Sequence, residues 1–211
     1  MPALIFPNGN ADAKRLAKAV SKGELKRIRQ GIYADASWEE IPQLLNNKWY
    51  EVVHALYPSA IASHATAALL VPHNKVVHIT TDVKIRKKVR ISDALVIEIH
   101  PGDTTHLTQA FLPTLFRSAP ARYLLENLQI AHKDADSPRA LGREWVETEL
   151  CKILERQGEG ELNCIRDDAR SYSDTAGLTK EFKQLDSMIG AILSTHPVSY
   201  THLTLPTICS V

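Results

Sequence analysis

The sequence predicts an α+β protein with a reduced winged helix, then a small mixed β-sheet with helices, and then an all-helical connector. Three observations predict this fold class. A basic helical pattern near the N-terminus is followed at once by a short hairpin pattern. Apolar, strand-like runs separated by turn residues fill the middle of the chain. From Gly142 onward, apolar residues recur only at helical spacing.

The segment 12–34 is expected to form a helix and then a tight β-hairpin. Apolar residues define one face of the helix, at Ala13, Leu16, Ala17 and Val20. Gly23 is placed to end this helix, and Arg29-Gln30-Gly31 forms the hairpin turn. The next segment, 38–56, reads as mostly helical.

The middle of the chain alternates short strands with helices. We expect strands at 60–62, 76–80 and 95–100, with a charged β arm at 84–91. Ser63 is a candidate N-cap for a helix that ends near Leu70. Ser118 is expected to cap a second helix, with Pro120 in its first turn.

The C-terminal part is predicted to be helical after a polar linker at 132–138. Its clearest amphipathic stripe is formed by Leu178, Phe182, Leu185, Ile189 and Ile192. We expect this stripe to be exposed in the isolated chain. The predicted regions are a winged-helix-like segment at 1–56, an α+β region at 57–131, a helical connector at 132–196 and a tail at 197–211.

Composition and charge narrow the function classes. The net charge of the chain is +1, but residues 1–100 carry a net +5 and residues 101–211 a net −4. The three cysteines fit no zinc-binding spacing, which favours a reducing, cytoplasmic compartment. No segment is apolar enough to span a membrane, so no membrane partner is expected.

Seven basic residues near the N-terminus are the candidate nucleic-acid-binding set, because a basic helix beside a basic hairpin can contact phosphates. The alternative is a charged face that only keeps the helix soluble. The residues are Lys14, Arg15, Lys18, Lys22, Lys26, Arg27 and Arg29. A second basic run at 84–90 reads more readily as a solvated arm.

Known catalytic motifs are absent from the sequence, and no metal site is predicted. The chain contains no phosphate-binding P-loop, no G-x-S-x-G and no H-E-x-x-H. His64, His73 and His78 are the closest histidines, but no carboxylate or cysteine completes a ligand pattern around them.

Two stretches carry a resemblance to AbiEi-type antitoxins. The run 23–33, GELKRIRQGIY, resembles the G-x-L-x-R-I-x-x-G-x-Y end of their winged helix, and 57–67, YPSAIASHATA, is similar to the segment after it. This resemblance implies a DNA-binding transcriptional repressor that controls a partner toxin.

A broader resemblance, over about residues 11–195, is to the N-terminal half of certain Fic-family proteins, in which an AbiEi-like region precedes the Fic domain. It is carried by the order of the segments and by the runs at 117–128, 141–143, 162–170 and 181–193. Fic proteins typically transfer AMP from ATP to a protein hydroxyl through H-x-F-x-[DE]-G-N-G-R, which this sequence lacks. The resemblance therefore implies no catalytic residue and no cofactor here, with ATP and Mg²⁺ expected only for a separate Fic domain.

The residues 197–211 lack charge and resemble a translated sequencing-adapter read-through. The first hypothesis is therefore that the chain is a non-catalytic, regulatory region of a truncated Fic-family protein. Its partners would be DNA and the Fic domain or another protein. The alternatives are an AbiEi-type, DNA-binding antitoxin and a protein-interaction module without nucleic acid.

Overall fold

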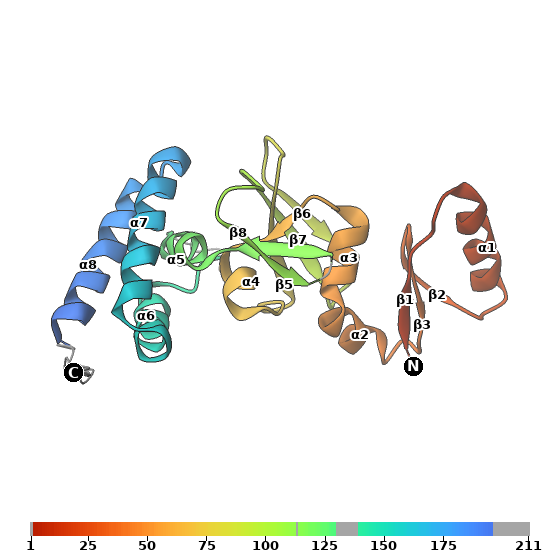
Figure 1. Cartoon of the computed structure of the whole chain (residues 1–211). Helices are drawn as coiled ribbons and strands as arrows, with labels where there is room; N and C mark the ends of the chain where they lie inside the picture. The colour runs from red at the N-terminus through yellow and green to blue at the C-terminus, as the bar shows by residue number, and fades with distance from the viewer. Residues whose placement is uncertain (1, 113, 130–138, 196–211) are drawn as a thin grey trace, which may run out of the picture.

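The computed structural model describes residues 2–112, 114–129 and 139–195. Along these residues, a small sheet with one helix, a six-stranded sheet and a group of four helices follow one another (Figure 1). This arrangement confirms the α+β fold class. The predicted linker at 132–138 and the segment 197–211 lie outside the described residues. Among those that are described, no helix combines the length and the apolar character needed to cross a membrane.

The N-terminal part has the helix-then-hairpin order expected from its sequence. Its elements are β1 (Ala3–Ile5), α1 (Asn10–Ser21), β2 (Lys26–Arg29) and β3 (Ile32–Asp35). The sheet order is β1-β3-β2 and both pairings are antiparallel. Strand β1, which the sequence did not predict, completes this sheet.

Helix α1 ends as predicted at its glycine. The N–H groups of Gly23 and Glu24 donate to the carbonyls of Val20 and Ala19. These two bonds form a Schellman motif, in which the residue after the cap adopts a left-handed conformation. Gly23 has a φ of 78°, which a glycine adopts without strain.

The apolar face of α1 is narrower than predicted. Leu16 is its buried residue, whereas Ala17 is exposed and Ala13 and Val20 are only half-buried. Small alanine side chains bury little apolar area, so α1 is fixed to the rest of the protein by few contacts.

The middle part is a six-stranded sheet with the order β6-β7-β5-β4-β9-β8. Strands β5 and β7 pair in parallel, as do β4 and β9, and the other neighbours are antiparallel. The strands are β4 (Ile61–Ala62), β5 (Val76–Thr81), β6 (Lys87–Arg90), β7 (Val96–Pro101), β8 (Thr108–Leu112) and β9 (Leu115–Ser118). Strands β4 to β7 match the prediction within a few residues, but the β8–β9 hairpin was not predicted.

Three helices accompany this sheet. The predicted helix at 38–56 is two helices, because the backbone leaves the helical region at Lys48. They are α2 (Ile41–Asn47) and α3 (Trp49–Leu56), and α4 (His64–Leu69) follows β4. Residues of α2 and α3 share one hydrophobic core with β1, β3, β5 and β7. The two sheets are therefore joined through a common core.

The C-terminal helices have a second core. They are α5 (Pro120–Leu128), α6 (Arg143–Gln157), α7 (Glu159–Ala176) and α8 (Thr179–Thr195). The stripe on α8, which we expected to be exposed, packs against the other helices of this group: Leu185 and Ile189 are fully buried. That expectation is wrong, because α5, α6 and α7 already supply the apolar cover.

Candidate functional site

The seven predicted nucleic-acid-binding residues lie on α1, on β2 and on the turn between them. Six of the seven are exposed to solvent, and Lys26 is half-buried. Arg15 pairs with Asp12 at 2.6 Å, and Lys22 lies 3.6 Å from Glu24. Within the part of the chain that the structure describes, the other five form no ion pair. Their charge is thus available to an anionic partner.

A contact that the sequence did not indicate joins this set to the second basic run. The guanidinium of Arg29 on β2 donates to the backbone carbonyl of Arg90 on β6. Lys87, Lys88 and Arg90 on strand β6 are all exposed to solvent. The two basic segments, separated by more than 50 residues in the chain, therefore meet where β2 and β6 approach each other. We call the seven N-terminal residues together with Lys87, Lys88 and Arg90 the basic surface.

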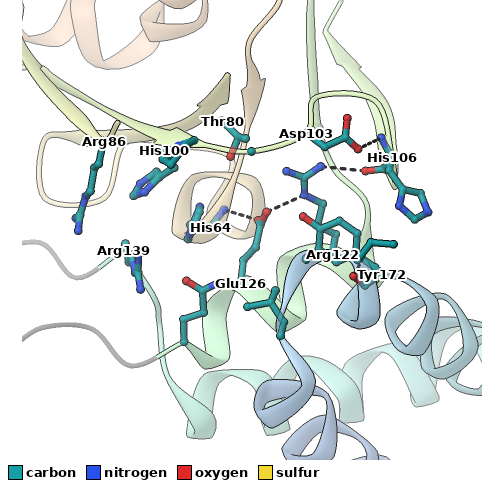
Figure 2. A pocket seen from close by; sticks show the side chains of 16 residues that line it. His64, Thr80, Arg86, His100, Asp103, His106, Arg122, Glu126, Arg139 and Tyr172 are labelled. Atoms are coloured by element: carbon teal, nitrogen blue, oxygen red, sulfur yellow. Dashed lines mark hydrogen bonds and ion pairs between the residues drawn. The ribbon is translucent and has the colours of Figure 1, made fainter. Parts of the chain in front are cut away.

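A pocket of about 700 Å³ lies between the six-stranded sheet and the C-terminal helices. The ends of β5 and β7 form one wall, α4 and α5 form another, and α7 closes a third side. Figure 2 shows Arg86 and Arg139 on one side of this pocket and the pair Arg122–Glu126 on the other. Small-ligand sites are usually concave and mostly apolar, with a few polar groups that fix the ligand. This pocket is concave and carries more charged groups than that pattern.

Polar side chains form one face of the paired strands β5 and β7. The register places His78 opposite Glu98 and Thr80 opposite His100. Because side chains alternate along a strand, these four point to the same face. All four are buried, with exposed fractions between 0 and 4 %. The opposite face carries the residues that enter the first core: Val77, Ile79, Ile97 and Ile99.

Three histidines meet at this polar face. Nδ1 of His78 lies 3.1 Å from Nε2 of His100, and the ring of His64 stacks on that of His100 with centroids 4.2 Å apart. Nδ1 of His64 lies 2.9 Å from the hydroxyl of Ser63. Nε2 of His78 is buried and has no hydrogen-bond partner among the residues that the structure describes.

Glu98 supplies a negative charge to the histidine cluster. Its side chain is 5 % exposed, and its Oε1 lies 3.7 Å from Nε2 of His100. The guanidinium of Arg86 pairs with Oε1, and the ammonium of Lys88 lies 3.7 Å from Oε2. A buried carboxylate needs such cations, because desolvation disfavours an unpaired charge.

Burial keeps the three histidines neutral. It lowers the pKa of His78 to about 3, with the Arg86 guanidinium adding to the effect. Burial likewise lowers the pKa of His64 and of His100 well below the ordinary value, and neighbouring histidines contribute to both shifts. Neutral imidazoles can donate one hydrogen bond and accept another, or bind a metal ion.

A buried ion pair within α5 lines the pocket. Nε of Arg122 lies 2.8 Å from Oε1 of Glu126, and both side chains are less than 5 % exposed. The other oxygen of Glu126 accepts from the backbone N–H of His64 and from the hydroxyl of Ser118. Ser118 therefore does not cap α5, as we had expected; Ala119 occupies the N-cap position.

The sequence prediction included two of the three clustered histidines, His64 and His78, but missed His100. It grouped His73 with His64 and His78, and it found no carboxylate nearby. The structure instead brings His100 and Glu98 to His78, because β7 lies beside β5. The alternation of polar and apolar residues in 76–81 and 96–101 was the available signal, and it was interpreted only as two strands.

Comparison with known proteins gave no match of any kind: no protein-family model, no curated protein and no solved structure is detectably similar to this chain.

Proposed function

We propose that this chain is a non-catalytic regulatory protein region that binds nucleic acid, with DNA as its partner, through the basic surface. The observation that carries the proposal is the contact of Arg29 with the carbonyl of Arg90, which joins two basic segments into one surface. A surface of this kind attracts phosphates without regard to base sequence.

The charges of the basic surface favour an extended polyanion over a single acidic residue. Lys14 and Lys18 lie one turn apart on α1. Arg27 and Arg29 lie two residues apart on β2, and both are exposed. Each phosphate that such a residue neutralises releases counterions from DNA, so affinity falls as salt rises.

The regulatory part of the proposal rests on the resemblances to AbiEi-type antitoxins and to the N-terminal region of Fic proteins. We propose that the helices α5 to α8 face a partner protein, such as a Fic domain. The amphipathic stripe of α8 is already buried, so this contact would use the outer, polar faces of the helices.

Fluorescence anisotropy with a labelled DNA duplex tests the proposal on the full chain. We expect binding at 50 mM salt, with log K falling by about 0.9 per phosphate for each tenfold rise in salt. The triple substitution Lys14→Ala, Lys18→Ala, Arg27→Ala should weaken binding at least about tenfold on unrelated duplexes and make the salt slope shallower.

A matched control removes three exposed cations from the other end of the molecule. The substitutions Arg143→Ala, Lys180→Ala and Lys183→Ala change the net charge equally but leave the basic surface intact. We expect less than about a twofold effect, since screened charges at this distance contribute little. Absence of binding at 50 mM salt, or equal losses in both triple variants, would overturn the proposal and favour a protein-interaction module.

The contribution of β6 is tested separately. Replacing Lys87 by alanine removes an exposed cation from β6. If the two basic segments act together, this change weakens DNA binding and Lys183→Ala does not. Identical affinities for the two variants would restrict the interface to α1 and β2.

A further inference from the structure

We propose that His78, Glu98 and His100 form a binding site for a divalent transition-metal ion, for which Zn²⁺ is the best match. The three residues come from two neighbouring strands, and one ligand atom from each lies within 4.8 Å of the others. The proposal does not rest on nucleic-acid binding, although Lys88 of the basic surface also lies beside Glu98.

The spacing of the ligand atoms fits one shared ion. Nδ1 of His78 and Nε2 of His100 are 3.1 Å apart, and Oε1 of Glu98 is 3.7 Å from Nε2 of His100. Two ligands that each lie ~2.0–2.1 Å from a tetrahedral ion are separated by about 3.4 Å. The two observed distances lie on either side of that value.

The backbone already holds the ligands in place. Parallel pairing of β5 with β7 fixes His78 opposite Glu98, and His100 follows two residues later on the same face. Burial of 96 % or more restricts the side chains of all three residues. Binding would therefore require little ordering of the protein, which is the main condition for a strong site.

Hydrogen bonds among the described residues leave part of this cluster without direct contacts. The separation of 3.7 Å between Oε1 of Glu98 and Nε2 of His100 is too long for a direct hydrogen bond. A cation between the three ligand atoms would give Glu98 and His100 a common partner. It would not satisfy Nε2 of His78, the ring nitrogen other than the proposed ligand atom Nδ1, which is buried without a partner in the described part of the chain.

Without a metal ion, Arg86 and Lys88 supply the positive charge that Glu98 needs. A metal ion could replace them. Their side chains are 46 % and 65 % exposed, so each can move into water when a metal ion takes its place beside Glu98. Arg86 therefore competes with the metal ion, which gives the proposal a distinctive test.

The donor set favours a transition metal over Mg²⁺ or Ca²⁺. Two imidazole nitrogens and one carboxylate suit Zn²⁺ and its neighbours, whereas Mg²⁺ and Ca²⁺ prefer oxygen ligands throughout. His100 also lines the 700 Å³ pocket. Three protein ligands would leave a coordination position for water or a ligand on that side.

The test titrates the full chain, freed of metal with EDTA, with Co²⁺ and then Zn²⁺. We expect one equivalent of Co²⁺ to give visible absorption bands of a nitrogen- and oxygen-ligated ion, and Zn²⁺ to displace it. Circular dichroism before and after establishes that each variant is folded.

Four single variants locate the site. Glu98→Gln and His100→Asn should each weaken Zn²⁺ binding at least about tenfold, since even outer-shell changes at metal sites commonly cost 10–100-fold. Arg86→Gln should instead tighten binding, because it removes the competing cation. His54→Ala removes an exposed histidine on α3 and should change nothing.

Three outcomes would overturn the proposal. They are the absence of stoichiometric Co²⁺ or Zn²⁺ binding, binding that Glu98→Gln and His100→Asn leave unchanged in the folded state, and weaker binding by Arg86→Gln. The last result would mean that the cluster is an ordinary buried hydrogen-bond and ion-pair network held together by Arg86.

Discussion

The two faces of the β5–β7 pair are both buried, yet they have opposite chemistry. One face presents Val77 and Ile97 with their neighbours to the first core, and the other presents His78 and Glu98 to the pocket side. Apolar burial stabilises the protein in proportion to area and needs no particular partner. Polar burial stabilises it only where every group meets a suitable partner, so the polar face is the one whose composition demands a functional explanation.

Of the changes considered, acid should reveal the largest difference between the two faces, because it destabilises the fold through the polar face alone. The folded protein holds its three buried histidines neutral, with the pKa of His78 at about 3, whereas unfolding lets them bind protons near pH 6.5. The unfolded state therefore binds more protons, and stability falls as pH falls from the unfolded pKa toward the folded one. Arg86 and Arg139 add to this effect, and Glu98 opposes it.

Lowering the pH from 7 to 5 should reduce the free energy of unfolding by about 2 kcal/mol for each histidine that is held neutral, or by about 6 kcal/mol for the three. Urea unfolding of the EDTA-treated chain across this range measures it. His100→Asn should make the dependence shallower, whereas His54→Ala should not. A stability that stays constant from pH 7 to pH 5 would show that these histidines are not held neutral.

Breaking the buried Arg122–Glu126 ion pair should have the next largest effect on the free energy of unfolding. Arg122→Met leaves Glu126 buried without its cation, which costs about 3–5 kcal/mol. Adding Glu126→Gln should restore part of the loss, because the unpaired charge is then gone. Thermal and urea unfolding of the single and double variants give these values.

The exposed pair Arg143–Glu147 provides the control for that experiment. Its side chains are 71 % and 42 % exposed, so Arg143→Met should cost no more than about 0.5 kcal/mol. If Arg122→Met is as mild as Arg143→Met, the buried pair contributes no more than a surface contact.

A substitution on the apolar face should cause a moderate loss of stability, and this loss should not depend on pH. Ile97→Ala removes a fully buried side chain from the first core and should cost about 3 kcal/mol at both pH 7 and pH 5. Ile85→Ala, at a residue that is 70 % exposed, should cost less than about 0.5 kcal/mol. A loss for Ile97→Ala that changes with pH would mean that the two faces are coupled.

Local features of the fold were predictable because local physics decides them. The end of α1 at Gly23 follows from the left-handed conformation that glycine tolerates. The β2–β3 hairpin follows from its turn residues, with Gly31 at a φ of 79°. By contrast, β1 and the β8–β9 hairpin have short and weakly patterned sequences, so they were missed.

The apolar stripe on α8 shows what a sequence pattern does not predict. Its periodicity correctly predicted an amphipathic helix, but periodicity does not identify what covers the apolar face. The cover comes from α5, α6 and α7 within the same chain, so Leu185 and Ile189 are buried rather than exposed.

The sequence by itself determined the α+β class, the helix and hairpin at the N-terminus, and the excess of positive charge in the first hundred residues. Each of these depends on residues that are close together in the chain. Only the tertiary structure decided that Arg29 meets Arg90 and that His78 and His100 share a site with Glu98. These contacts depend on which strands become neighbours and in what register, and strand pairing over such distances is set by the packing of the whole core.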